Sequence, residues 1–201
     1  MIIAVFDYGA GNLHSLLKTL STEGEVTVVR DPLTLLASDL IVLPGVGGWS
    51  AGVAALGSAG PQLRAAIRAG HPTLGICLGM QLLFDQSEEA PGAGLGVIAG
   101  TVTRLHARRV PEIGWNSVES VRDPLFDEGP SIVYYAHSFA CRPASEAPVI
   151  AWTTHERDRF AAAVRMENTI GVQFHPEKSS QAGVALLRRA VRTLLPQPAR
   201  A

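Results

Sequence analysis

The chain has 201 residues, of which 47% are hydrophobic and 17% are charged, and its formal net charge is −1. This length and apolar content predict a single domain spanning residues 1–201. The near-neutral charge argues against binding to nucleic acid or to an anionic membrane surface. Two cysteines, Cys77 and Cys141, are too few for a disulfide framework, and no CxxC pair suggests a zinc site. We therefore expect a cytoplasmic protein with free thiols, no metal and no membrane span.

The first half of the chain alternates between short apolar runs and amphipathic stretches. Strands are expected at residues 2–6, 26–29, 40–43 and 73–76, and helices at residues 13–20, 50–57, 61–69 and 78–85. Strands that are apolar throughout and alternate with helices indicate a parallel sheet covered on both faces.

The second half is richer in strands joined by short loops. Strands are expected at residues 97–105, 113–118, 132–136, 149–153, 160–164 and 169–174, and a closing amphipathic helix at residues 180–195. Short connections favour antiparallel pairing. The predicted fold is therefore α/β and flavodoxin-like, with three layers: a mostly parallel central sheet flanked by helices, and an antiparallel extension.

Three motifs with weaker support suggest other chemistries. Gly9-Ala10-Gly11 follows the first strand as in dinucleotide-binding folds, but His14 occupies the position of the third glycine. Residues 48–52 match the G-x-S-x-G of serine hydrolases, yet no strand leads directly into that serine. His155-Glu156 begins like a zinc-protease helix, but Arg159 stands where the second histidine belongs. Each of these readings is less favoured than an ordinary turn, helix start or surface position.

The segment Gly75-Ile76-Cys77-Leu78-Gly79 has the form G-x-nucleophile-x-G. An apolar strand leads into it and a helix leaves it, and the flanking glycines permit a sharp turn that exposes the cysteine. Free N–H groups at the helix start favour the thiolate, and the N–H of Leu78 can bind a developing oxyanion. The alternative is a buried structural cysteine, which is how we interpret Cys141.

A base for this nucleophile is expected at His175-Pro176-Glu177. In an extended segment, residues two apart project from the same face, so Glu177 could orient the imidazole while its other nitrogen faces Cys77. Taken alone, His-x-Glu is more often an exposed strand end, but the cysteine motif favours a Cys-His-Glu triad.

Together, GICLGMQ at residues 75–81 and HPE at residues 175–177 resemble the triad-type class I glutamine amidotransferases. The resemblance implies that the cysteine attacks the side-chain amide of glutamine, releases ammonia and leaves a glutamyl thioester that water hydrolyses. It implies that histidine acts as base and then as acid, and that glutamate holds the histidine.

Further segments are similar to one family of this class, the glutaminase subunits of imidazole glycerol phosphate synthase. They are DYGAGNL (residues 7–13), PGVG (44–47), GWN (114–116), HS (137–138) and QFHPEKS (173–179). The resemblance implies a heterodimer with a (β/α)₈-barrel cyclase, which uses the ammonia to make imidazole glycerol phosphate and aminoimidazole carboxamide ribotide in histidine biosynthesis. It implies no cofactor.

The same resemblance implies roles for individual residues of the site. The oxyanion hole would be formed by Val46 and Leu78, the glutamine contacts by Gly47, Gln81, Glu89, Ser138 and Phe139, and the contacts to the cyclase by Asn12, Trp115 and Lys178. It further implies that the isolated subunit has low activity, because the Gly45-Val46 peptide must reorient before Val46 can donate to the oxyanion.

The chain departs from the family pattern at Glu112. Histidine usually follows the proline there, whereas Glu112 follows Pro111 here, close to the expected docking face. Two alternative functions stay open: a glutaminase that serves another synthase, and a catalytically silent binding module of the same fold. The loop at residues 44–47 argues against the first, and the complete set of Cys77, His175 and Glu177 argues against the second.

Overall fold

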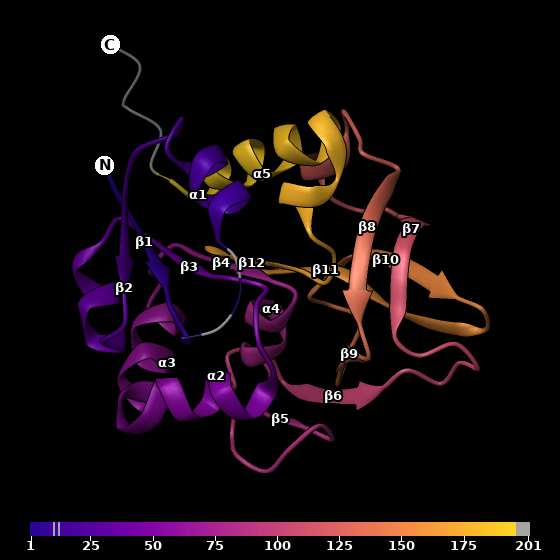
Figure 1. The fold of residues 1–201 in the computed structure, drawn as a ribbon, viewed down its shortest axis with the longest axis horizontal. Helices are drawn as coiled ribbons and strands as arrows, with labels where there is room; N and C mark the ends of the chain where they lie inside the picture. The colour runs from indigo at the N-terminus through magenta and orange to yellow at the C-terminus, as the bar shows by residue number, and fades with distance from the viewer. Residues whose placement is uncertain (10, 12, 196–201) are drawn as a thin grey trace.

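The structure is a computed structural model that describes residues 1–9, 11 and 13–195. In this part of the chain a seven-stranded sheet has the order β10-β11-β12-β4-β3-β1-β2 (Figure 1). The parallel strands are β1 (Ile2–Phe6), β2 (Glu25–Val29), β3 (Leu40–Leu43), β4 (Thr73–Ile76) and β12 (Thr169–Val172). Taken in chain order, these strands are arranged 2-1-3-4-5, which is the flavodoxin-like order.

The antiparallel extension of this sheet consists of β10 (Val149–His155) and β11 (Asp158–Met166), which continue from β12. The sequence-based prediction of a mostly parallel sheet with an antiparallel extension is confirmed. Pairing β12 with β4 is important for function, because it brings the carboxyl ends of these two strands together.

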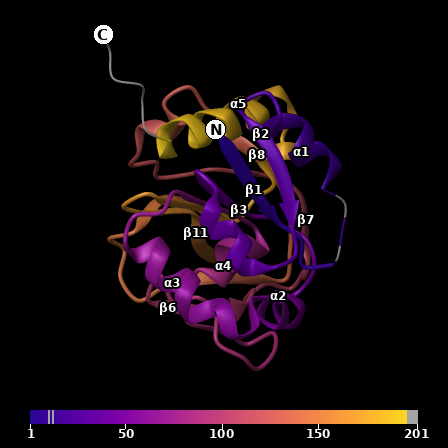
Figure 2. The same cartoon turned by 90° about the vertical axis from the view of Figure 1, so that its left-hand side faces the viewer.

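Helices cover both faces of the sheet (Figures 1 and 2). On one face lie α1 (His14–Leu20) and α5 (Ser180–Leu194), and on the other lie α2 (Trp49–Leu56), α3 (Gly60–Arg68) and α4 (Leu78–Leu82). The predicted three layers are therefore present.

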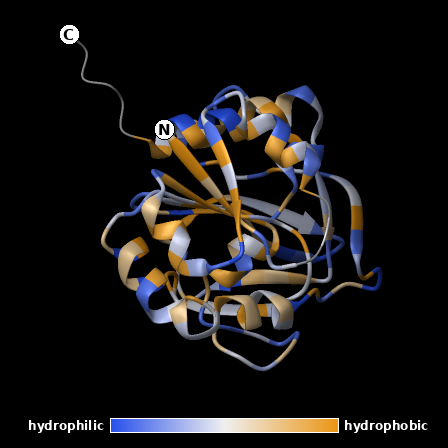
Figure 3. Ribbon diagram, turned by 60° about the vertical axis from the view of Figure 1, so that its left-hand side comes forward, coloured by the Kyte–Doolittle hydropathy of each residue, from blue (hydrophilic) through white to orange (hydrophobic). Residues whose placement is uncertain are grey.

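Apolar strand side chains alternate between the two helical layers. In β1, Ile3 and Val5 join the core beneath α1 and α5, whereas Ala4 and Phe6 join the core beneath α2, α3 and α4. Figure 3 shows the hydrophobic strands between helices whose outer faces are more polar. Burial on both faces explains why these strands are apolar throughout rather than alternating.

Other strands of the second half form two small sheets beside the central sheet. They are β5 (Gln86–Ser87), β6 (Gly100–Arg104) and β9 (Phe139–Pro143) in one small sheet, and β7 (Glu112–Ser117) with β8 (Ile132–His137) in another. Short 3₁₀ turns are formed by Pro32–Ala37, Gly57–Ala59, Pro124–Phe126 and Pro176–Lys178. The β5 and β9 strands were not predicted.

The expected helix at residues 78–85 ends early, at Leu82. A returning loop explains this, because Leu95 N donates to Leu82 O at 2.7 Å and Val97 N donates to Leu83 O at 2.7 Å. The same bonds occupy the backbone at Val97, so the expected strand at residues 97–105 starts only at Gly100. Among the helices that the structure describes, none is long and apolar enough to cross a membrane.

Candidate active site

Cys77 lies in a sharp turn between β4 and α4. Its φ of 47° is in the left-handed region, which costs a non-glycine residue on the order of 1–3 kcal/mol. Two glycines make the turn possible. A Cβ on Gly75 would lie 2.7 Å from Gly79 O, and a Cβ on Gly79 would overlap Leu43 O. The predicted strand-turn-helix elbow is therefore present, and it holds Cys77 at the carboxyl end of β4.

His175 and Glu177 lie just beyond the end of the neighbouring strand, β12. The prediction that both belong to one extended segment is wrong, because Glu177 is part of a 3₁₀ turn, Pro176–Lys178, that starts after His175. The turn nevertheless brings the two side chains together, with His175 Nδ1 2.9 Å from Glu177 Oε1. It is held in place by Ser179, whose hydroxyl donates to His175 O at 2.6 Å.

The imidazole of His175 is only 4% exposed and contacts both Cys77 and Glu177. Burial alone lowers the pKa of His175. The charge of Cys77 and its hydrogen bond to the imidazole, together with the bond to Glu177, outweigh burial and raise the pKa to about 10. This arrangement favours an imidazolium beside the sulfur, which places a proton donor next to the candidate nucleophile.

A second side chain, besides His175, contacts the sulfur. Gln173 is fully buried, and its Nε2 lies 3.6 Å from Cys77 Sγ. Its Oε1 lies 3.5 Å from Gln81 Nε2, which also donates to Phe139 O at 2.9 Å. No role of its own was predicted for Gln173. One feature of the sequence could have identified it: its amide lies between two apolar residues at the end of a strand, where a buried polar group requires partners.

A cavity of about 280 Å³ opens beside Cys77. It is lined by the nucleophile, by Leu78 of the expected oxyanion hole, and by all the residues expected to contact glutamine: Gly47, Gln81, Glu89, Ser138 and Phe139. Val46 is not part of this lining, and its side chain packs where a Cβ on Gly11 would lie. Glu89 reaches the same loop, since a Cβ on Gly48 would come within 2.6 Å of its Oε1.

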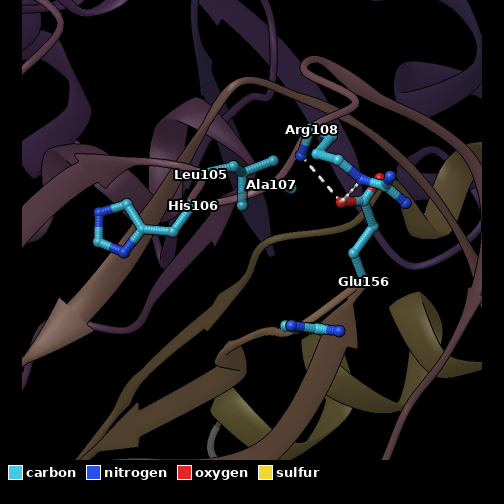
Figure 4. Close-up of a pocket in the computed structure, with 6 residues that line it drawn as sticks. Leu105, His106, Ala107, Arg108 and Glu156 are labelled. Atoms are coloured by element: carbon cyan, nitrogen blue, oxygen red, sulfur yellow. Dashed lines mark hydrogen bonds and ion pairs between the residues drawn. The ribbon is translucent and has the colours of Figure 1, made fainter.

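A second hollow of about 720 Å³ lies away from Cys77 and has a different character. Its lining includes Leu105, His106, Arg108 and Glu156 (Figure 4). The carboxylate of Glu156 accepts a hydrogen bond from the backbone N–H of Arg108 at 2.8 Å. The side chain of Arg108 is 95% exposed. These groups hold a surface loop and include no nucleophile with a base. In the described part of the chain, no group of three or more His, Cys, Asp or Glu side chains is arranged to hold a metal ion.

The residues expected to face a partner are partly on the surface. Trp115 on β7 is 56% exposed and Lys178 is exposed, whereas Asn12 lies outside the described residues. Glu112 was expected close to the docking face. Its side chain is 5% exposed and points into the protein, where it meets His137 and His155.

The fold and the site together define a class I glutamine amidotransferase. The family described as glutamine amidotransferase class-I matches residues 4–193, and the chain belongs to it. Over 199 residues the chain is 42% identical to imidazole glycerol phosphate synthase subunit HisH of Gloeobacter violaceus, covering 94% of this chain and 88% of that protein. Over 190 residues it is 44% identical to the HisH subunit of Pyrococcus furiosus, covering 92% and 96%. Within this class, the chain therefore belongs to the family of the HisH subunits of imidazole glycerol phosphate synthase.

Solved structures with a similar fold are more distant in sequence. PurLQS from Thermotoga maritima matches with a TM-score of 0.75 at 20% identity, covering 96% of this chain and 98% of that one. A glutamine amidotransferase from the same organism matches with a TM-score of 0.69 at 18% identity, covering 98% and 99%. These similarities support the class I fold.

Proposed function

We propose that the chain hydrolyses L-glutamine to glutamate and ammonia with Cys77 as nucleophile, His175 as acid and base, and Glu177 as the group that orients the histidine. The observation that carries this proposal is the buried imidazole of His175, which contacts Cys77 on one side and Glu177 on the other. The adjacent cavity supports it by placing the expected glutamine contacts beside the sulfur.

In the first step the thiolate of Cys77 attacks the side-chain amide carbon of glutamine, which forms a carbon–sulfur bond and an oxyanion. The backbone N–H groups of Leu78 and Val46 would stabilise that charge. The imidazolium of His175 then protonates the leaving nitrogen, and the carbon–nitrogen bond breaks to release ammonia. A glutamyl thioester remains on Cys77.

In the second step His175, now neutral, takes a proton from water, and the hydroxide attacks the thioester carbon. The carbon–sulfur bond breaks, glutamate leaves and the thiolate is restored. Throughout, Glu177 keeps the imidazole in one orientation and stabilises its positive charge. The cycle consumes one glutamine and one water, and it needs no cofactor.

The ammonia is proposed to pass to a (β/α)₈-barrel cyclase bound as a heterodimer, which forms imidazole glycerol phosphate and aminoimidazole carboxamide ribotide. Support comes from the exposed apolar side chains Ile113, Trp115 and Ile132 on the β7–β8 pair. Large apolar residues that remain exposed together are typical of protein–protein contacts. We further propose that activity stays low until the partner binds and the Gly45-Val46 peptide turns, so that Val46 can donate to the oxyanion.

The test is glutamate release from glutamine, measured with and without the cyclase subunit. We expect release by the complex, little by the chain alone, and none by the complex of the C77A variant. A wild-type complex that releases no glutamate would exclude the hydrolase. Co-purification with a different synthase, together with failure to bind the cyclase, would favour the alternative of a glutaminase that serves another pathway.

A further inference from the structure

Glu112 lies directly behind the wall of the cavity beside Cys77. It begins β7 and pairs with His137 at the end of β8. Its neighbours Pro111 and Ile113 line the cavity, as do His137 and the following Ser138. Glu112 itself turns inward and is 5% exposed, so its carboxylate acts on the site through other groups.

Two histidines and an amide surround this carboxylate. His137 Nε2 lies 3.2 Å from Glu112 Oε2, and His155 Nδ1 lies 3.5 Å from Oε1. Asn116 donates its Nδ2–H to Oε1 at 2.8 Å and also to Thr154 O at 3.0 Å. A buried carboxylate is costly unless it is paired, and Asn116 provides a hydrogen bond to Oε1, whereas Oε2 touches His137 Nε2 without a hydrogen bond.

The remaining ring nitrogens fix where the protons are. His137 Nδ1 lies 2.9 Å from Phe139 O, and His155 Nε2 lies 2.8 Å from Arg109 O. A carbonyl oxygen only accepts, so both of these nitrogens carry hydrogen. His137 Nε2 and Glu112 Oε2 lie in contact without a hydrogen bond between them, so the carboxylate holds the ring by packing against it.

The ring of His137 in turn fixes the carbonyl of Phe139. That oxygen accepts from His137 on one side and from Gln81 Nε2, at 2.9 Å, on the other. Both lone pairs of the carbonyl are therefore used. Because Phe139 and Gln81 both line the cavity, the orientation of this part of its wall depends on His137.

We propose that Glu112 is a positioning residue for glutamine: through His137 it holds the Ser138–Phe139 segment and Gln81 in the geometry that binds the amino-acid end of the substrate. The inference rests on the proposed glutaminase function and adds a residue to it. Because binding energy lost equally in ground state and transition state appears in KM, loss of Glu112 raises KM more than it lowers kcat.

The experiment compares steady-state glutamate release by complexes that contain the wild-type chain, E112L or E112Q. Leucine removes the carboxylate that the His137 ring contacts, and we expect KM for glutamine to rise about tenfold or more while kcat changes less than about threefold. Glutamine at the same position can donate its amide to a neutral His137 Nε2. We therefore expect E112Q to keep KM within about threefold of the wild-type value.

The matched control is E119L. Glu119 accepts from the hydroxyls of Ser117 at 3.0 Å and Thr154 at 3.2 Å, so its loss also removes polar contacts near β7, but none of them leads to Phe139. Thermal denaturation of each variant reports structural damage. We expect E119L to lower the Tm without raising KM, since a smaller fraction of folded protein reduces the apparent kcat alone.

Three results would overturn the proposal: an E112L protein with wild-type KM, an E119L protein with the same rise in KM, or an E112Q protein no better than E112L. If E112L does not fold, H137Q replaces it, and an unchanged KM in that variant also overturns the proposal. A wild-type complex without activity refutes the proposed function and this inference together. An active wild type with unaffected E112L refutes only the inference.

Discussion

Gly45 lies where a side chain would separate the nucleophile from the base. A Cβ added there would be 2.9 Å from Cys77 Cβ, 2.9 Å from His175 Cε1 and 3.0 Å from Ile76 O. Ordinary contacts between such atoms are about 3.5–4.0 Å, so the G45A variant must open the site by about 0.5–1 Å. The carbonyl of Ile76 is part of the backbone and cannot rotate away, so the displacement falls on Cys77 and His175.

The magnitude follows from this displacement. Forcing an extra methyl group into a packed region costs about 1–3 kcal/mol, which for a chain of this size lowers the Tm by roughly 2–4 °C per kcal/mol. Misplacing catalytic groups by about 1 Å reduces the rate about 100-fold. We therefore expect G45A to remain folded, with a modestly lower Tm and about 1% of the wild-type kcat for glutamate release.

The matched control is G60A. Gly60 begins α3 with φ of −47°, and an added Cβ would meet nothing within 4 Å. We expect wild-type activity and a free energy of unfolding that is unchanged or slightly lower, because a residue with a Cβ disfavours the helical backbone before Pro61. Both variants are assayed as complexes with the cyclase subunit and by thermal denaturation. Wild-type activity in G45A would refute the reasoning that Cys77 and His175 must meet across this glycine.

Three further predictions follow from the contacts of the site. The raised pKa of His175 means that its pairing stabilises the fold fully below the ordinary value of 6.5 and loses this effect as pH rises through about 10. The free energy of unfolding of wild type should therefore exceed that of E177Q most below pH 6.5, with the difference shrinking toward pH 10; a constant difference in urea titrations would contradict this. Replacing Gln173 with leucine should lower the free energy of unfolding by about 1–3 kcal/mol, because Gln81 loses a buried acceptor. The same variant should slow the alkylation of Cys77 by iodoacetamide, because the sulfur loses its contact with the amide. An alkylation rate equal to that of wild type would show that this contact has no effect on reactivity. The W115A variant should change the free energy of unfolding by less than about 0.5 kcal/mol but weaken cyclase binding about tenfold or more, measured by titration calorimetry; unchanged affinity would place the docking face elsewhere.

The fold could be predicted largely because its central strands are buried on both faces. That burial produces the apolar runs at Ile2–Phe6, Leu40–Leu43 and Thr73–Ile76, and each run is followed by a helix. The elbow at Cys77 could be predicted for a similar reason, since its two flanking glycines record a local steric requirement.

Features set by contacts between distant residues could not be predicted. The early end of α4 depends on a loop that returns to Leu82 and Leu83 from residues 95–98. The contact of Gln173 with Cys77 joins residues 96 positions apart. Periodicity and motif spacing carry no information about such pairs.

Glu112 illustrates the same limit for the site. Glu112 was expected close to the docking face and precedes the exposed residues Ile113 and Trp115, but a strand alternates its side chains between two faces. The partners that decide its environment, His137 and His155, come from other strands. Only the ladder between β7 and β8 shows that Glu112 lies opposite His137.

The central claim is that Cys77 forms a covalent glutamyl intermediate, and mass spectrometry of acid-quenched complex tests it most directly. After mixing with glutamine, we expect a glutamyl group on the peptide that contains Cys77, none on the peptide that contains Cys141, and none in the C77A variant. Because His175 supplies the proton for ammonia and activates water, an H175A complex should form the adduct far more slowly. Equal rates of glutamate release by the wild-type and C77A complexes would contradict the account. So would a glutamyl adduct found only at a residue other than Cys77.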